Sequence, residues 1–360
     1  MSRSPNSSTV RQARHSVDEL TSWAARILET AQVPSVDAVT TAQLLIRSDL
    51  RGFGTHGLAR LTSYMERLRA NDFNPRPRIS FNRQGAAWVV EADGALGQVV
   101  GQRVVEEATS FLVDQPVLWA TLHEAGHLGA LGMLALAAAE RGNICFLGQR
   151  TPPLLGLPGF GERALGHNPF AFGAPVGNGS PPFVFDMACS VAARGHILLA
   201  AREGKPIPSN WALNTEGAPT TDAAEAVDGM LRPAGDYKGM GIAMMIECLA
   251  GALAATAASN ASPAMSLAAG GVMSRASAFL FFVNPGMVGE KADFLSYMNH
   301  WISYYKKAGA EAARIPGARG DDMERLGRQT GLTYSTAIEA ELRTLGRVSG
   351  IPFPEEGQLQ

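Results

Sequence analysis

The spacing of apolar residues changes twice along this chain, and these changes limit the folds that it can adopt. Residues 16–70 have the spacing of amphipathic helices, with Ser16 and Ser35 placed to cap the first two. From Ala86 short apolar runs alternate with helical stretches, and from Met287 the pattern is helical again. We therefore expect a helical part and a part built on a β-sheet.

The central part of the chain is predicted to contain short strands with helices between them. The predicted strands are 87–92, 117–122, 143–147, 183–187 and 278–283, and the predicted helices are 97–114, 128–141 and 190–203. Two stretches rich in Pro and Gly, 151–181 and 204–236, are too long for simple connectors and are expected to line a site. The longest apolar run, 240–258, contains Glu247 and consists largely of Ala, Gly and Met, which favours a buried helix over a membrane span.

One glycine-broken turn near the N-terminus gathers side chains that can do chemistry. If a third helix begins at about Thr55, then His56, Arg60 and Tyr64 stand four residues apart and line one face. The imidazole can exchange a proton near neutral pH, and a guanidinium can hold a carboxylate with two hydrogen bonds. Thr55 can orient the imidazole, and Tyr64 and Arg51 are further candidates for binding a substrate. The alternative is a capped surface helix with solvated polar side chains.

The same turn contains a motif that resembles a nucleotide-binding loop. The glycines Gly52, Gly54 and Gly57 match the pattern G-x-G-x-x-G. A Rossmann turn needs a buried strand before the first glycine, whereas residues 35–51 have helical spacing. We therefore do not expect a Rossmann site here.

A second motif matches the zinc-peptidase signature H-E-x-x-H at His123, Glu124 and His127. That site requires a helix, but Gly126 lies inside the motif and a predicted strand ends directly before it. A zinc hydrolase is thus a minor alternative. Read as a strand-to-helix turn, the segment places His127, Gly129 and the first amides of the next helix where they can meet a phosphate or a nicotinamide carboxamide. The structural alternative is a common glycine-rich turn.

Composition limits the class of protein. The 360 residues are 46% hydrophobic, enough for one large or two ordinary domains. The 31 Lys and Arg against 33 Asp and Glu give no basic surplus that would favour a nucleic-acid partner. Three separated cysteines in apolar surroundings suit a reducing compartment, and the polar N-terminus has no secretory signal, so we expect a soluble cytoplasmic protein with no membrane partner.

Several short motifs occur in a fixed order along most of the chain. They are Asp49-Leu-Arg-Gly with Thr55-His-Gly-Leu-Ala-Arg60, His127-Leu-Gly-Ala, Gly166-His-Asn-Pro169, Phe183-Val-Phe-Asp-Met-Ala188 with Ala193-Arg-Gly195, Gly217-Ala-Pro-Thr-Thr-Asp222, and Tyr237-Lys-Gly239. This set resembles the type-2 malate/L-lactate dehydrogenases, a family that includes ureidoglycolate, sulfolactate and diketogulonate oxidoreductases and piperideine-2-carboxylate reductases.

The resemblance implies an α/β fold that is not a Rossmann fold. A mixed, mainly antiparallel sheet flanked by helices, over residues 79–286, would bind the cofactor. A helical domain built from both chain ends, 1–78 and 287–360, would serve substrate binding and dimerisation. The implied cofactor is NAD or NADP, the implied partners are a small carboxylate substrate and a second copy of the chain, and no metal is implied.

The resemblance also implies roles for individual residues. His56 would give or take the proton with help from Thr55, and Arg60 would hold the substrate carboxylate. His127 would lie by the nicotinamide, and has itself been assigned the acid/base role in some members. The other expected cofactor contacts are Leu128, Gly129, Ala130, Asp186, Met187, Ala188, Arg194, Gly195, Lys238, Arg314, Pro316 and Gly317.

Three departures from the family pattern bear on chemistry. Thr55 stands where serine is usual, and Asp236 stands where a glycine usually precedes Tyr-Lys-Gly. His196 occupies the position at which imine-reducing members carry an aspartate, which favours hydroxy-acid chemistry over reduction of a cyclic imine. The sequence therefore predicts an NAD(P)-dependent oxidoreductase that interconverts a 2-oxo acid and its 2-hydroxy acid, with a cyclic-imine reductase as the alternative.

Overall fold

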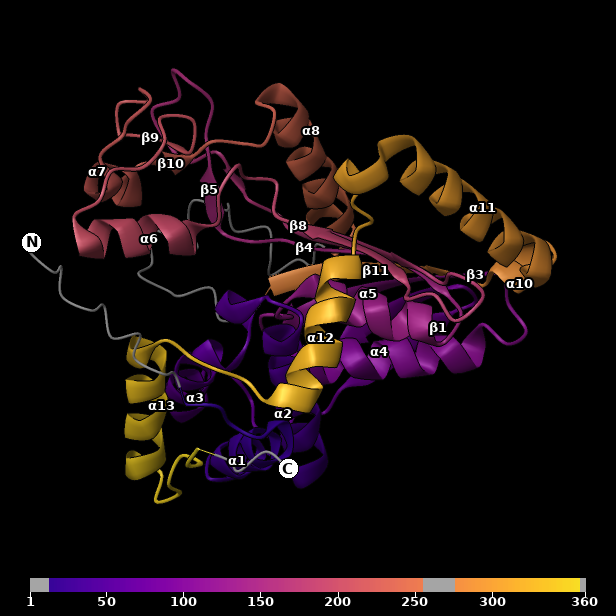
Figure 1. Ribbon diagram of the computed structural model, residues 1–360, viewed down its shortest axis with the longest axis horizontal. Helices are drawn as coiled ribbons and strands as arrows, with labels where there is room; N and C mark the ends of the chain where they lie inside the picture. Colours follow the sequence, from indigo (N-terminus) through magenta and orange to yellow (C-terminus); the bar gives the residue numbers. More distant parts are fainter. Residues whose placement is uncertain (1–12, 255–275, 357–360) are drawn as a thin grey trace, which may run out of the picture. The chain divides into compact units, whose positions relative to one another are not determined.

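The computed structural model describes residues 13–254 and 276–356 (Figure 1). The chain divides into two compact units, Met1–Met65 with Gly320–Gln360 and Glu66–Arg319. Described residues from both ends of the sequence therefore belong to the first unit. Within the described ranges, no helix is long and apolar enough to cross a membrane.

The division between units differs from the predicted boundaries in two places. Residues 66–78 and 287–319, which were expected in the helical part, belong to the unit that contains the sheet. The long helix α11, Lys291–Gly309, packs Met298 and Ile302 with sheet residues such as Phe172. The predicted division into a substrate-binding part and a cofactor-binding part stays a prediction.

The first unit is helical. Its elements are α1 (Val17–Glu29), α2 (Ser35–Leu50), two 3₁₀ helices (Gly54–His56 and Leu58–Arg60), part of α3 (Leu61–Arg69), most of α12 (Ala318–Thr330) and α13 (Thr336–Val348). Ser16 caps α1 as predicted, because its hydroxyl accepts a hydrogen bond from the Glu19 amide. The predicted cap at Ser35 is wrong: Ser35 is the first helical residue, and Pro34 precedes it without a side-chain cap.

Aromatic packing joins the C-terminal segment to α1. The indole nitrogen of Trp23 donates a hydrogen bond to the Ile351 carbonyl at 3.0 Å. The ring of Phe353 meets Trp23 edge-on, with the ring centroids 4.9 Å apart. His15 and Leu332 exchange backbone hydrogen bonds. Contacts between residues more than 300 positions apart therefore build the core of this unit.

The predicted helix from Thr55 to Ala70 is wrong in its first half. Residues 54–60 form two 3₁₀ turns, and the α-helix begins only at Leu61. Gly57 separates the two turns with a backbone at φ −92° and ψ −146°, which is far from helical. His56, Arg60 and Tyr64 therefore do not share one helical face.

The second unit is built on a seven-stranded sheet in the order β1-β2-β3-β11-β4-β7-β8. The strands are β1 (Ser80–Gln84), β2 (Ala87–Glu91), β3 (Val117–Ala125), β4 (Ile144–Gln149), β7 (Phe170–Ala174), β8 (Phe183–Met187) and β11 (Ala276–Val283). Among these strands β2 and β3 pair in parallel, and every other neighbouring pair is antiparallel. The expected mixed, mainly antiparallel sheet is confirmed.

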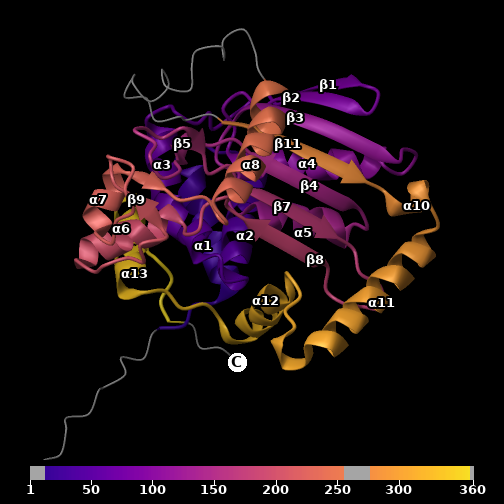
Figure 2. The same cartoon turned by 90° about the horizontal axis from the view of Figure 1, so that it is seen from above.

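Helices cover both faces of this sheet. The helices α4 (Gly97–Phe111) and α5 (Leu131–Glu140) lie on one side, and α8 (Tyr237–Ile246) lies on the other (Figures 1 and 2). A π-helical segment, Glu247–Ala252, continues α8, and its Ala250 packs with Phe279 of β11. Leu118, Ala120 and Leu122 of β3 are fully buried, which is the period-two pattern of a strand with a covered face.

The two stretches rich in Pro and Gly contain a small second sheet. Its order is β6-β5-β10-β9, with the bounds Leu165–Gly166, Pro153–Leu155, Met230–Leu231 and Ala212–Leu213. Helices α6 (Arg194–Glu203) and α7 (Ala223–Asp228) pack with it around Leu155 and Ile197. Among the described residues, the remaining short helices are α10 (Pro285–Val288) and a 3₁₀ turn (Ala310–Ala312). Strands of two or three residues are too short to show a periodic pattern in sequence.

Three predicted boundaries change in ways that affect the site. The predicted strand 117–122 continues to Ala125, so the turn predicted at His123 is wrong. The helix predicted from 128 begins at Leu131, and the helix predicted from 190 begins at Arg194. Residues 255–258 of the predicted helix 240–258 lie outside the described residues.

Candidate active site

In the first unit, Thr55 contacts both His56 and Arg60, the candidate proton donor and the candidate carboxylate ligand. Thr55 Oγ1 lies 2.9 Å from Nδ1 of His56, which is the contact expected for a hydroxyl that orients the imidazole. The carbonyl oxygen of Thr55 accepts a hydrogen bond from Nε of Arg60 at 2.7 Å. Within the described residues, the terminal guanidinium nitrogens of Arg60 carry no hydrogen bond. The turn thus carries an oriented imidazole and an open guanidinium edge.

The other two candidate substrate residues are buried within this unit. Tyr64 is 2% exposed in α3, and Arg51 is 5% exposed at the end of α2. Arg51 Nη1 lies 2.9 Å from a carboxylate oxygen of Glu324. Burial acts to raise the pKa of Glu324, but Arg47, Arg328 and Arg51 together lower it below its ordinary value. A substrate carboxylate would have to displace Glu324 to reach Arg51.

Asp49, which the sequence placed in a motif without a role, anchors the turn. Its Oδ2 accepts hydrogen bonds from the Leu58 amide at 2.9 Å and from the Tyr334 hydroxyl at 3.0 Å. Burial raises the pKa of Asp49 to about 7, although these two hydrogen bonds lower it. Tyr334 approaches from the segment before α13, 285 positions away, so no local pattern reveals the contact.

In the second unit, the loop between β3 and α5 carries the second candidate histidine, His127. Gln149 of β4 clamps this loop: its Nε2 donates to the Gly126 carbonyl at 3.1 Å, and its Oε1 accepts from the Leu128 amide at 3.2 Å. Gly129 has φ +78°, a region that favours glycine. The structure therefore holds the predicted cofactor residues 127–130 on a fixed, irregular backbone.

Asp186, at the end of β8, joins that loop to the sheet. Its Oδ2 accepts a hydrogen bond from the Gly132 amide at 2.7 Å and so caps the N-terminus of α5. The Gly132 amide is consequently not free for a phosphate. Burial raises the pKa of Asp186 to about 6, against the lowering effect of that bond. Within the described residues Oδ1 accepts no hydrogen bond, which leaves it available to a ligand hydroxyl.

Another predicted cofactor stretch lies beside β8. The Pro316 carbonyl accepts a hydrogen bond from the Val184 amide at 3.2 Å. Gly317 has φ +91°, and a Cβ there would lie 3.0 Å from the Val184 nitrogen. Arg314 donates to the carbonyl of Ala313. The structure thus brings Arg314, Pro316 and Gly317 to the strand that carries Asp186, Met187 and the adjoining Ala188.

The remaining predicted cofactor residues lie at helix starts of the second unit. Arg194 and Gly195 open α6, Lys238 is the second residue of α8, and all three are exposed. Asp236 has φ +53° and ψ −113°, a conformation that favours the glycine usual at this position. Its carboxylate pairs with Arg232 at 2.7 Å.

The zinc-peptidase motif does not have the required geometry. His123 and Glu124 lie in β3, whereas His127 follows the strand, so the two histidines are not one helical turn apart. His123 is 8% exposed, and its Nδ1 lies 3.5 Å from a carboxylate oxygen of Glu91. Among the residues that the structure describes, no group of three His, Cys, Asp or Glu side chains could hold a metal ion.

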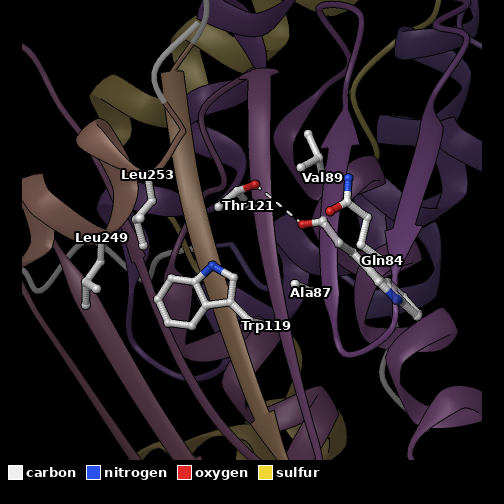
Figure 3. A pocket seen from close by; sticks show the side chains of 8 residues that line it. Gln84, Ala87, Val89, Trp119, Thr121, Leu249 and Leu253 are labelled. Carbon is white, nitrogen blue, oxygen red and sulfur yellow. Dashed lines mark hydrogen bonds between the residues drawn. The ribbon is translucent and has the colours of Figure 1, made fainter.

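A pocket of about 390 Å³ lies elsewhere on the large sheet (Figure 3). Its walls are mainly apolar and include Trp88, Trp119, Leu249 and Leu253. The Thr121 hydroxyl in its wall donates a hydrogen bond to the Trp88 carbonyl at 3.4 Å. Figure 3 marks this bond with a dashed line at the labelled Thr121. None of the predicted site residues lines this pocket.

Comparison with known proteins decides the family. The sequence model of the malate/L-lactate dehydrogenases matches residues 15–343. The chain belongs to this family. The dehydrogenase is 36% identical over 245 residues to malate dehydrogenase of Pyrococcus horikoshii, covering 66% of this chain and 68% of that protein.

Two further relatives carry their cofactor in their names. The (2R)-3-sulfolactate dehydrogenase (NADP(+)) of Chromohalobacter salexigens is 34% identical over 239 residues, covering 66% of this chain and 71% of that protein. The ureidoglycolate dehydrogenase (NAD(+)) of Escherichia coli is 36% identical over 217 residues, covering 60% of this chain and 61% of that protein.

Solved structures share the fold. The malate dehydrogenase of Pyrococcus horikoshii superposes with a TM-score of 0.83 at 27% identity, covering 97% of this chain and 99% of that chain. The Δ1-piperideine-2-carboxylate reductase of Pseudomonas syringae gives 0.81 at 23% identity, covering 92% and 99%. The dehydrogenase is thus an NAD(P)-dependent enzyme that acts on the CH–OH group of a hydroxy acid, as the sequence predicted.

Proposed function

We propose that this dehydrogenase interconverts a 2-oxo acid and its 2-hydroxy acid with His56 as the proton donor and acceptor and Arg60 as the carboxylate ligand. The observation that carries the proposal is the arrangement around Thr55, whose hydroxyl orients the imidazole while its carbonyl holds the guanidinium. The reaction needs a proton for the new hydroxyl and a cation for the carboxylate, and these two side chains provide them.

The second unit supplies residues that suit a nicotinamide dinucleotide. Oδ1 of Asp186 can accept a hydrogen bond from a ribose hydroxyl, and the exposed cations Arg194 and Lys238 can meet phosphates. The loop with Leu128, Gly129 and Ala130 offers fixed backbone, as does the stretch Arg314, Pro316 and Gly317 along β8. The bound cofactor provides or accepts the hydride. In reduction, His56 donates its proton to the oxygen that becomes the hydroxyl, while Arg60 keeps the carboxylate in place.

The substrate is proposed to be a small acid of the malate or lactate kind. Relatives with 34–36% identity include dehydrogenases named for malate, sulfolactate and ureidoglycolate. His196, in the first turn of α6, lies with its ring 6.1 Å from that of Trp211. The imidazole cannot replace the aspartate of the imine-reducing members as an anion, which favours hydroxy-acid chemistry.

The test is the absorbance of reduced nicotinamide in the presence of pyruvate, oxaloacetate, other 2-oxo acids and a cyclic imine, with NADH and NADPH in parallel. Oxidation of one cofactor by an oxo acid is expected and settles NAD against NADP. Turnover of the imine alone would transfer the proposal to the reductase class. If no compound of the panel oxidises either cofactor, both the oxo-acid and the imine-reductase proposals are refuted.

We further propose that the enzyme is a cytoplasmic homodimer. The three cysteines, Cys145, Cys189 and Cys248, are all unpaired thiols, which suits a reducing compartment. Light scattering coupled to size exclusion should give twice the 38.1 kDa chain mass, and a monomer peak would refute the dimer. Fractionation of cells that produce the protein tests the compartment.

A further inference from the structure

The carboxyl group of Asp49 touches the backbone between the two proposed substrate residues. Its Oδ2 accepts the Leu58 amide at 2.9 Å, and the Tyr334 hydroxyl donates to the same oxygen at 3.0 Å. Leu58 begins the 3₁₀ turn that ends at Arg60, and the Arg60 amide closes that turn on the Gly57 carbonyl at 2.9 Å. Asp49 therefore caps the turn that carries the guanidinium.

Gly57 is the residue against which the Asp49 carboxyl group packs. A Cβ at Gly57 would overlap the carboxyl group of Asp49, although the φ of −92° is allowed for any residue. The close approach of the Asp49 carboxyl group requires glycine at this position. At Gly54, three residues earlier in the same segment, a Cβ would lie 3.9 Å from Asp49 Oδ1, which is ordinary van der Waals contact.

We propose that Asp49 is a positioning residue that fixes the separation of His56 and Arg60 by holding the peptide between Gly57 and Leu58. This inference rests on the proposed roles of these two residues. His56 precedes the held peptide directly, and Arg60 lies one 3₁₀ turn after it. A shift of that peptide would move the proton donor and the carboxylate ligand relative to each other, and misplacement by about 1 Å costs catalysis about a hundredfold.

The cost of the carboxyl group supports a role in function. Burial disfavours its charged form strongly enough to raise its pKa to about 7. An asparagine could accept the same two hydrogen bonds without an ionisable group in this position. Proteins tend to keep such costly groups at functional sites.

The test compares two pairs of variants. Asp49→Ala removes the acceptor for both donors, whereas Asp49→Asn keeps it. We expect Asp49→Ala to lower kcat by about a hundredfold, and Asp49→Asn to restore most of it. Gly57→Ala should match the loss in Asp49→Ala, while Gly54→Ala keeps kcat within about threefold, because its added methyl group has space.

Two measurements without substrate separate positioning from general destabilisation. In Asp49→Ala and Gly57→Ala, hydrogen exchange of the 54–60 segment should accelerate at least tenfold, and the NMR titration of His56 should shift, while exchange in α1 stays unchanged. Equal effects of Gly57→Ala and Gly54→Ala on kcat and on exchange would overturn the proposal. So would an Asp49→Ala enzyme with wild-type kcat and wild-type exchange. If Asp49→Ala does not fold, the glycine pair still decides.

Failure of the proposed function gives a different result. If the wild-type enzyme reduces no 2-oxo acid, the roles of His56 and Arg60 fall, whatever the variants do. Accelerated exchange of 54–60 in Asp49→Ala would then still support the anchor itself. An active wild-type enzyme with insensitive Asp49 and Gly57 variants would leave the function intact and refute the positioning role.

Discussion

The segments that contain His56 and His127 are each held by a carboxyl group, but they present different groups to a ligand. Asp49 accepts a hydrogen bond from the turn that follows His56. The loop that contains His127 leads into α5, whose N-terminus is capped by Asp186. Each carboxylate accepts a backbone amide of another element, nine positions away for Asp49 and 54 positions away for Asp186. Asp49 also accepts the Tyr334 hydroxyl at Oδ2, and among the described residues Oδ1 accepts no hydrogen bond in either Asp49 or Asp186. In Asp49, however, Oδ1 faces Gly57, where an added Cβ would overlap it.

This difference suits the two proposed tasks. On the proposed substrate side, Asp49 serves to hold the backbone, and the proposed ligand-binding groups are the side chains on the turn. On the proposed cofactor side, Asp186 fixes the start of α5, and we propose that it also offers Oδ1 to a ligand. Gln149 takes the purely structural task there, with two hydrogen bonds to the loop before α5. Anchoring and binding are thus separated in the first region and shared in the second.

The sharpest test of the comparison is Arg60→Lys. Lysine keeps the charge but cannot offer a planar pair of donors to a carboxylate. We expect the KM for the oxo acid to rise about ten- to a hundredfold, the value of one charge-assisted hydrogen bond, while the KM for the cofactor changes little. Arg325→Lys, in an exposed pair with Asp322 on α12, is the control and should alter neither. Equal rises in both KM values would contradict the assignment of substrate binding to the His56 turn and of cofactor binding to the His127 loop.

Gln149→Ala is expected to have a smaller effect than Arg60→Lys, and on the other substrate: the KM for the cofactor should change instead of the KM for the oxo acid. The variant leaves the Leu128 amide and the Gly126 carbonyl without their buried partner, which costs about 1–3 kcal/mol of folding free energy. Thermal unfolding should show this loss, and steady-state kinetics should show a raised KM for the cofactor with the KM for the oxo acid little changed. Gln102→Ala, whose amide contacts Glu106 at the surface, provides the matched control. An unchanged cofactor KM would remove the loop from the cofactor site.

The last expected effect is a difference in the pH dependence of stability. Burial raises the pKa of Asp49 from 3.8 to about 7, and that of Asp186 from 3.8 to about 6. The folded protein keeps these protons after the unfolded chain has lost them, so the free energy of unfolding falls as pH rises from about 4 to each folded-state pKa and is level above it.

Asparagine does not titrate, so each variant removes one of these contributions. Relative to wild type, the melting temperature of Asp49→Asn should rise with pH up to about 7, and that of Asp186→Asn only up to about 6. Melting curves between pH 4 and 8 measure both. Variant and wild-type curves that run parallel over this range would contradict the assignment of raised pKa values.

Local patterns predicted much of this fold. Ser16 caps α1, the strand at 183–187 has the predicted ends, and the apolar run before Asp93 forms β2. The family motifs correctly implied the mixed, mainly antiparallel sheet. These features depend on periodicity, capping and motif order, which are present in the sequence itself.

The parts that failed depend on contacts between distant residues. The helix predicted from Thr55 breaks into turns at Gly57, where the Leu58 amide bonds to Asp49 instead of continuing an α-helix. β3 extends through His123 because β2 and β11 continue to pair with it. The roles of Asp49 and Gln149 were missed for the same reason: their partners lie on other elements, and neither residue type indicates an anchor by itself.

The central claim is that His56, and not His127, moves the proton. The direct measurement is the pH profile of kcat/KM for oxo-acid reduction in wild type, His56→Ala and His127→Ala. We expect His56→Ala to lose about a hundred- to ten-thousandfold in rate together with the dependence on a group near neutral pH, and His127→Ala to keep that dependence while the KM for the cofactor rises. A His56→Ala enzyme that keeps the wild-type profile, with the dependence lost in His127→Ala, would contradict the assignment and transfer the acid/base role to the second unit.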